Sequence, residues 1–224
     1  MTSPLCAADA IEFIVKGRVI LRSVYVDAVP GTITALVGRS GAGKSTLFWI
    51  LVGLKRARAG QVRWAGERVE RPRLPALARL GLAFGPDRPF LAPGLSTAEH
   101  LALLEGGSEV IGQVGIGAWA GRPAGTLSGG EQRLSELAVL LARRPKALVL
   151  DEPFRGLAPV MRDRIAELLR GAAKQGVAVL YADHDVTQVR ETADRLFSME
   201  NGTTRPVEGF RDRPLAEWYH AWPQ

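Results

Sequence analysis

This chain has few of the residues that build disulfide-linked or membrane-spanning proteins. It contains one cysteine, Cys6, among 224 residues, so no internal disulfide forms and a reducing compartment is expected. We interpret Cys6 as a small buried or frayed residue. Glycine or charge interrupts every apolar run well short of the roughly 20 residues of a membrane helix, and no charged-then-apolar leader opens the sequence. These absences favour a soluble, cytosolic globular protein.

Aromatic residues are also scarce, at 7%, and none alternate with a basic stripe. The formal net charge of +6 and the pI of about 10.0 are typical of nucleic-acid-binding proteins, but here the cations are scattered and nearly all arginine. We therefore expect no nucleic-acid partner. We assign the excess positive charge to the solvated surface, where it would interact favourably with anionic lipid headgroups.

Residues 38–46 read GRSGAGKST, the spacing of a phosphate-binding loop. An apolar run, TITALV, precedes them and LFWILVGL, with helical composition, follows. The glycines let backbone N–H groups point at anionic oxygens, Lys44 reaches the β- and γ-phosphates, and the Ser45 hydroxyl is the expected Mg²⁺ ligand. A glycine-rich turn without nucleotide is the alternative. The residues expected to bind ATP here are Gly38, Arg39, Ser40, Gly41, Ala42, Gly43, Lys44, Ser45 and Thr46.

A second apolar run, ALVL at 147–150, is predicted to be a buried parallel strand. It delivers Asp151 and Glu152 to the carboxyl edge of the sheet, where doubly wound folds bind ligands. We expect Asp151 to hold Mg²⁺, directly or through water. Glu152, on the opposite side of the strand, is expected to polarise an attacking water as general base. Alternatively, the two acids merely end a strand.

LSGGEQ at 127–132 precedes a run with apolar residues at helical spacing. Ser128 and Glu131 make a capping box, which alone could explain the pattern. A cap does not need the adjacent glycines, however, whereas close approach of backbone N–H groups to a phosphate does. The second predicted nucleotide contact comprises Ser128, Gly129, Gly130, Glu131 and Gln132.

Together with ALVLDEP and a later histidine, these motifs resemble the nucleotide-binding subunit of an ATP-binding cassette (ABC) transporter over nearly the whole chain. The resemblance implies an α/β fold of the P-loop NTPase type. Its doubly wound, mainly parallel sheet would carry an N-terminal antiparallel β subdomain and an inserted helical subdomain. We treat residues 1–224 as a single ABC ATP-binding domain, with the helical subdomain at roughly 91–144.

The resemblance also implies an ATPase that uses ATP and Mg²⁺ and works as a pair. Two ATP molecules would be sandwiched in a head-to-tail dimer, formed with itself or a paralogous cassette, in which LSGGEQ contacts the opposite γ-phosphate. Separate transmembrane permease subunits would be its partners, on the cytoplasmic face of the inner membrane. The transported substrate and its direction stay open, with features similar to both branched-chain amino-acid importers and lipopolysaccharide exporters.

His184 follows an apolar run at 177–181 and resembles the family's switch histidine, which contacts the γ-phosphate and supports the catalytic glutamate. A surface or core histidine is the alternative.

Asp87 lies near the position where the family usually has glutamine, and it is either a further Mg²⁺ ligand or the start of a turn before Pro89.

Two other positions depart from the family pattern. Ala158 replaces an aspartate that hydrogen-bonds across the dimer, which puts cross-protomer communication in doubt. Val15, with Phe13 nearby, replaces the aromatic residue that stacks on adenine, so base stacking is expected to be weak.

Local signals predict the remaining organisation. Hairpins are expected from 12–15 with 19–26, and from 61–64 with 68–69 across AGE. A capping box at Ser96 and Glu99 opens a helix over 97–105, and the glycine-rich stretch 106–117 is expected to be flexible. Trp218, Tyr219 and Trp222 in the tail are expected to pack on the domain surface.

Two rival functions remain at this stage. One is a soluble ABC-type ATPase acting on nucleic acid, but this chain lacks the second cassette and the long insertions usual in such proteins. The other is a slow regulatory module that closes on ATP without rapid hydrolysis, an alternative that the departures at Ala158 and Val15 keep open.

Overall fold

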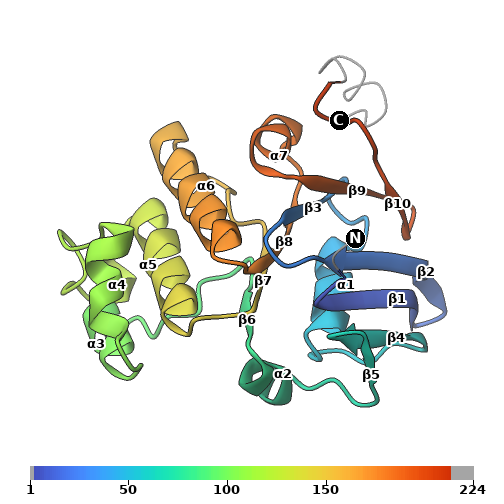
Figure 1. Cartoon of the computed structure of the whole chain (residues 1–224), viewed down its shortest axis with the longest axis horizontal. Coiled ribbons are helices and arrows are strands. Elements are labelled where there is room, and N and C mark those ends of the chain that lie inside the picture. The colour runs from blue at the N-terminus through green and yellow to red at the C-terminus, as the bar shows by residue number, and fades with distance from the viewer. Residues whose placement is uncertain (1–2, 213–224) are drawn as a thin grey trace.

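The computed structural model describes residues 3–212, which form two β-sheets with helices packed around them (Figure 1). The strands are β1 (Cys6–Val15), β2 (Arg18–Ala28), β3 (Ile33–Val37), β4 (Ala59–Trp64), β5 (Glu67–Val69), β6 (Leu82–Gly85), β7 (Ala147–Asp151), β8 (Ala178–Asp183), β9 (Arg195–Glu200) and β10 (Thr203–Pro206). The helices are α1 (Lys44–Leu51), α2 (Leu74–Leu80), α3 (Thr97–Ala102), α4 (Gly107–Val114), the 3₁₀ turn η1 (Ala124–Thr126), α5 (Gly129–Ala142), α6 (Pro159–Lys174) and α7 (Val186–Thr192). Within residues 3–212, no helix has the length and hydropathy needed to cross a bilayer. The tail with Trp218, Tyr219 and Trp222 lies outside the described residues.

The larger sheet has the order β10-β9-β3-β8-β7-β6, and all its strands except β10 run parallel to their neighbours. Every residue of β3, β7 and β8 is buried. A strand covered on both faces needs apolar side chains at successive positions, which is why these segments read as continuous apolar runs. The predicted mainly parallel α/β sheet is confirmed.

The smaller sheet is antiparallel, with the order β2-β1-β4-β5, and it contains both predicted hairpins. The first turns at Lys16 and Gly17, with φ of 46° and 78°. The second turns at Ala65 and Gly66, with φ of 50° and 85°, so Glu67 belongs to the strand and not to the turn. Two consecutive residues with positive φ are typical of the tight turns that match strand twist.

Helix α1 packs between the two sheets. One apolar cluster combines residues of α1 with residues of β1, β2 and β4 and with one face of β7 and β8. The α1 side chains in it are Leu47, Phe48, Ile50 and Leu51, all almost fully buried. Each contributes about 1.5–3 kcal/mol of burial free energy. This packing fixes the start of α1, and therefore the phosphate-binding loop, against the main sheet.

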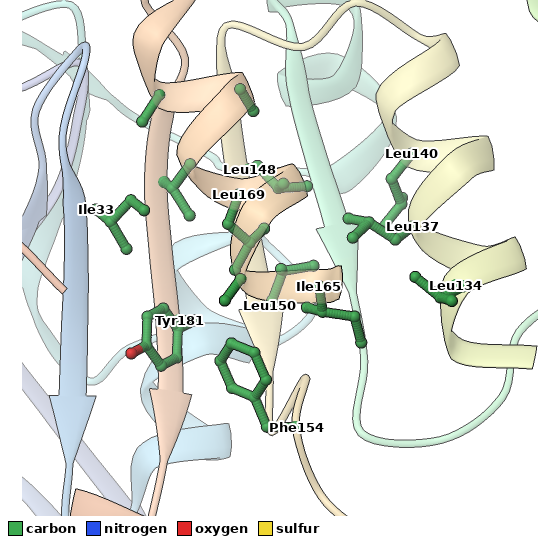
Figure 2. Packing of buried hydrophobic residues seen from close by; sticks show 14 of the residues in the cluster. Ile33, Leu134, Leu137, Leu140, Leu148, Leu150, Phe154, Ile165, Leu169 and Tyr181 are labelled. Atoms are coloured by element: carbon green, nitrogen blue, oxygen red, sulfur yellow. The ribbon is translucent and has the colours of Figure 1, made fainter. Parts of the chain in front are cut away.

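The opposite face of the main sheet is covered by α5 and α6 (Figure 2). Leu148 and Leu150 of β7 belong to the same apolar cluster as Ile165 and Leu169 of α6. The rings of Phe154 and Tyr181 meet edge to face, with centroids 5.5 Å apart and planes at 79°. This favourable aromatic geometry anchors the segment just after Glu152.

Helices α3, α4 and α5 lie between β6 and β7 in the chain and gather at one end of the molecule (Figure 1). The prediction that 106–117 is flexible was wrong, since it contains α4, with Val110 and Val114 buried. Gly106 and Gly115 have φ of 68° and 70° and bound that helix, because glycine adopts this conformation without strain. The capping box at Ser96 is present, although α3 ends at Ala102 rather than at residue 105.

Candidate functional site

The strand register brings several predicted site residues to one edge of the main sheet. Val37 at the end of β3 pairs with Asp183 at the end of β8. Asp151 at the end of β7 pairs with Ala182, and Gly85 of β6 pairs with Leu150. The phosphate-binding loop and the segments that begin at residues 86, 152 and 184 therefore leave the sheet side by side. This carboxyl edge is where doubly wound sheets bind ligands.

The phosphate-binding loop depends on glycine at three places. A Cβ on Gly38 would lie 2.4 Å from the carbonyl oxygen of Met199, so the backbones of β3 and β9 approach too closely for any side chain. Gly41 and Gly43 have φ of 80° and 110°. Gly43 is the N-cap of α1, which has no acidic residue in its first turn. No carboxylate in this turn therefore competes with an incoming anion for the N–H groups of the loop and of the helix N-terminus.

The Lys44 side chain is buried against the loop. Its Nζ donates to the carbonyl oxygens of Gly38 at 2.7 Å and Arg39 at 3.1 Å. Burial lowers the pKa of Lys44, and the carboxylates of Glu152 and Asp151 oppose that effect. The ammonium group thus lies where the loop and the carboxylates of β7 meet.

Asp151 is a buried carboxyl group at the end of β7. It is fully buried, and neither of its oxygens has a hydrogen-bond partner among residues 3–212. Burial raises its pKa to about 6, and the Ser45 hydroxyl lowers it in part, although its approach does not reach hydrogen-bond geometry. Asp87 is close enough to raise that pKa further.

These residues fit Mg²⁺. A divalent cation would satisfy the two orphaned oxygens of Asp151, and hydroxyl and carboxylate oxygens are the ligands that it prefers. In the described part of the chain, no three His, Cys, Asp or Glu side chains form a metal site by themselves. Binding would therefore need phosphate oxygens to complete the coordination.

Glu152 owes its direction to a backbone feature that the sequence did not reveal. We expected strand alternation to place its side chain on the opposite side of the strand from Asp151. Instead, β7 ends at Asp151, and Glu152 has φ of 49°. Left-handed backbone in a non-glycine residue costs about 1–3 kcal/mol. The Glu152 N–H donates to the carbonyl of Ala182 at 2.9 Å, which holds the turn in place. Its Oε2 accepts from Nη1 of Arg155 at 3.2 Å.

His184 lies beside Glu152. Its Nδ1 is 3.8 Å from Oε1 of Glu152, and its side chain is 56% exposed. Asp183, which was not predicted from the sequence, accepts from the backbone N–H of His184 at 2.7 Å and of Asp185 at 3.0 Å and so holds the turn that carries His184. Burial raises the pKa of Asp183. Its position directly before His184 was visible in the sequence, but its burial was not.

The segment that carries Asp87 is tied to α5 by a charged pair that the sequence analysis also missed. Arg133 donates to the carbonyl oxygens of Pro86 at 2.9 Å and Asp87 at 3.1 Å. Glu136 accepts from Arg133 at 3.1 Å and from the N–H of Phe90 at 2.9 Å. Burial raises the pKa of Glu136, and Arg133 opposes the change. A charged residue amid the apolar spacing of this helix was the available signal.

LSGGEQ opens α5, and its capping box is confirmed. The Ser128 N–H donates to Oε2 of Glu131 at 2.8 Å, and the Glu131 N–H donates to Oγ of Ser128 at 3.4 Å. The glycines differ in surroundings. A Cβ on Gly130 would lie 2.9 Å from Cγ of Met161 on α6, whereas a Cβ on Gly129 would meet no described atom within 4 Å. Helix packing therefore explains Gly130, and Gly129 leaves space for an incoming group.

A cavity of about 560 Å³ lies next to the phosphate-binding loop. Arg18, Val19, Ile20 and Arg22 of β2 line it together with residues 39–42 and 199–202. Val15 does not line it, and the sequence analysis missed Arg18 and Arg22, which look like ordinary surface charges in a strand. Of the residues that the structure describes, none in 127–132 reaches this cavity.

Comparison with known proteins gives a consistent result. A sequence model of the ABC transporter family matches residues 21–155. The lipopolysaccharide export system ATP-binding protein LptB of Acidithiobacillus ferridurans is 30% identical over 212 residues, which are 89% of this chain and 88% of that protein. The high-affinity branched-chain amino acid transport ATP-binding protein BraG of Pseudomonas aeruginosa is 31% identical over 81% of this chain and 83% of its own length.

Solved structures show the same fold at lower identity. An ATP-binding cassette of an ABC transporter in its ADP conformation has a TM-score of 0.86 at 22% identity, covering 98% of this chain and 99% of that one. The cbiO1 protein of Clostridium perfringens, described as part of the ABC transporter complex cbiONQ, has a TM-score of 0.82 at 24% identity. That match covers 96% of this chain and 92% of cbiO1.

Proposed function

Because this chain belongs to the ABC transporter family of ATP-binding proteins, we propose that it hydrolyses ATP in a head-to-tail dimer that drives separate permease subunits. One observation carries the proposal. Lys44, Asp151, Glu152 and His184 belong to segments that leave one sheet edge, whereas LSGGEQ opens α5 and lines no part of the cavity beside the loop. A second copy supplies the missing contact through its own Ser128, Gly129 and Gly130.

Binding relies on the loop and the carboxylates beside it. The N–H groups of residues 38–46 hold the phosphates, and Lys44 reaches the β- and γ-phosphates. Asp151 and Ser45 would hold Mg²⁺, with Asp87 as a further oxygen ligand. When bound, Mg²⁺ offsets the negative charge of the β- and γ-phosphate oxygens.

Hydrolysis follows from the placement of Glu152. Its carboxylate accepts a proton from the attacking water while the bond between the γ-phosphorus and the bridging oxygen breaks. His184, 3.8 Å from that carboxylate, holds Glu152 and contacts the γ-phosphate. The products are ADP and phosphate, two anions that no longer link the protomers, so the dimer opens.

We further propose transmembrane permease subunits as partners and the cytoplasmic face of the inner membrane as the place of work. Two relatives with coverage above 80% are named for lipopolysaccharide export and for branched-chain amino acid transport, and cbiO1 is described as part of a transporter complex. Closure of the dimer would favour one conformation of the permease subunits over another.

The test compares Glu152→Gln and Lys44→Ala with the wild-type chain. Glu152→Gln should bind Mg-ATP, elute as a dimer in size-exclusion chromatography and release no phosphate. Lys44→Ala should lose nucleotide binding and stay monomeric with Mg-ATP. Asp163→Asn, an exposed change on α6, serves as the control that leaves both properties intact. Wild-type hydrolysis by Glu152→Gln, or its failure to dimerise with Mg-ATP, would contradict the proposal.

A further inference from the structure

A groove of about 650 Å³ lies at the end of α1 that points away from the phosphate-binding loop. Its walls are residues 53–58 after α1, strands β4 and β5, and residues 70–73 before α2, in the lower part of Figure 1. On α1, its lining begins with Ile50, six residues after Lys44, which places the groove about 9 Å or more from Lys44 along the helix. No described residue lines both this groove and the cavity beside the loop.

The groove is strongly basic. Six of its lining residues are cations, against a single acid, Glu70, among the described residues. The cations are Lys55, Arg56, Arg58, Arg68, Arg71 and Arg73. Such a concentration of one sign in a concave surface raises the local concentration of anions.

Two of these cations already have partners. Arg68 forms an ion pair with Glu70 at 3.2 Å, and Lys55 lies over the ring of Trp49 at 4.6 Å from its centroid. Arg56, Arg58, Arg71 and Arg73 form no ion pair and no side-chain hydrogen bond with any residue in 3–212. Four guanidinium groups therefore line one groove without an ion-pair partner among the described residues.

Guanidinium chemistry selects among anions. Its planar fork donates two parallel hydrogen bonds to carboxylate or phosphate oxygens. A single carboxylate carries one charge and is neutralised by one arginine, whereas a phosphate group presents three or four oxygens to several arginines at once. Four unpaired guanidinium groups around one groove thus match a phosphate better than a carboxylate.

The groove also has apolar surface. Leu54 supplies it, with 53% of the residue exposed, whereas Ile11, Ile50 and Val62 lie behind the wall of the groove and are buried. Mixed apolar and cationic lining fits a phosphate that is esterified to an organic group. Extended nucleic acid fits less well, because the nearby Trp49 ring already contacts Lys55 and is not free to stack on a base.

We propose that this groove is a second anion site, separate from the phosphate-binding loop, which takes the phosphate of a phospholipid headgroup or of a soluble phosphate ester or pyrophosphate. The site does not depend on ATP hydrolysis. It stands on the unpaired arginines and on the shape of the groove.

The experiment uses the full chain carrying Lys44→Ala, so that the phosphate-binding loop does not contribute. One variant adds Arg56→Gln and Arg71→Gln, and a second adds Arg58→Gln and Arg73→Gln. The matched control adds Arg143→Gln and Arg205→Gln, which removes two exposed charges outside the groove. Circular dichroism checks the fold of each protein, although exposed changes of this kind shift stability by about 0.5 kcal/mol at most.

Pyrophosphate binding is measured by calorimetry, and vesicle binding by co-sedimentation with phosphatidylcholine, with and without phosphatidylglycerol. We expect each groove variant to lose affinity about tenfold and the control to change less than about twofold. Loss in the vesicle arm alone identifies the lipid headgroup as the source, and loss in the pyrophosphate arm alone identifies a soluble phosphate.

Equal binding by the groove variants and the control in both arms would overturn the proposal. Binding of a single-stranded RNA oligonucleotide is measured in the same proteins. The proposal would also be overturned if the groove variants lost RNA binding alone. Because all compared proteins carry Lys44→Ala, either result is independent of whether the loop binds ATP.

Discussion

Arg155 donates through Nη1 to Oε2 of Glu152 at 3.2 Å, so the proposed general base is already paired with a cation from its own chain. The Arg155 side chain is 63% exposed and lies three residues after Glu152. The other oxygen of Glu152 faces His184. An attacking water must therefore compete with Arg155 for Oε2.

We predict that Arg155→Gln raises ATP turnover at saturating Mg-ATP. An exposed ion pair is worth about 0.2–1 kcal/mol, so freeing the carboxylate should raise kcat by up to about fivefold. Arg155→Lys keeps the charge and should stay near the wild-type rate. The gain should shrink at high salt, which screens the pair in the wild-type protein. A lower kcat in Arg155→Gln would show that Arg155 assists hydrolysis instead.

The burial of Asp151 predicts opposite effects on stability and activity. Its pKa rises to about 6 in the folded protein, above the value of about 4 of an unfolded aspartate. The folded state therefore binds more protons between these values, and its stability falls as pH rises through that window. Without Mg²⁺, Asp151→Asn should be more stable than wild type at pH 7, by on the order of 2 kcal/mol.

The same substitution should abolish Mg²⁺-dependent ATP hydrolysis. Urea unfolding at pH 7 and pH 3 checks the stability effect, because the difference should vanish below the unfolded pKa of about 4. Equal stability of the two proteins at pH 7 would count against a buried, unpaired carboxylate.

Ala158 leaves α6 without a side-chain cap. It is the N-cap of this 16-residue helix, with φ of −64° and ψ of 151°, and no side-chain cap hydrogen bond forms there. Since this is the backbone conformation of capping residues, Ala158→Asp and Ala158→Asn should each stabilise the protein by about 1 kcal/mol. Thermal unfolding measures the change, with Ala158→Val as a control that offers no acceptor. No gain from either polar residue would mean that the loop before α6 cannot present a cap.

The two glycines of LSGGEQ should respond differently to a methyl group. Gly130→Ala places a Cβ 2.9 Å from Cγ of Met161 and should destabilise the chain by about 1–3 kcal/mol. Adding Met161→Ala should restore part of that loss. Gly129→Ala meets open space and should leave urea unfolding nearly unchanged while it weakens the ATP-dependent dimer. Equal unfolding midpoints for Gly129→Ala and Gly130→Ala would contradict this assignment.

Local sequence signals predicted much of the fold. The apolar runs that became β3, β7 and β8 are continuous because both faces of the sheet are covered. Both capping boxes and both hairpins depend on residues close together in the chain, so their geometry could be read directly. The error at 106–117 arose because glycine serves equally in a flexible loop and at a helix boundary, and only the burial of Val110 and Val114 separates these cases.

Contacts between distant segments could not be predicted in this way. Arg133 and Glu136 hold the segment of Asp87 from 46 or 47 residues away, and a charged residue within an apolar helix pattern does not reveal which distant segment it contacts. The groove likewise combines arginines from β5 and from the segments flanking β4 and α2, which look like scattered surface charges in the sequence.

By itself, the sequence determined the family, the phosphate-binding loop and the order of the strands and helices around it, because these depend on residue type at short spacing. Only the tertiary structure decided how Glu152 is aimed, that Asp151 is left without a partner and which arginines share a groove. Those properties arise from burial and from strand register, which bring together atoms that the chain keeps far apart.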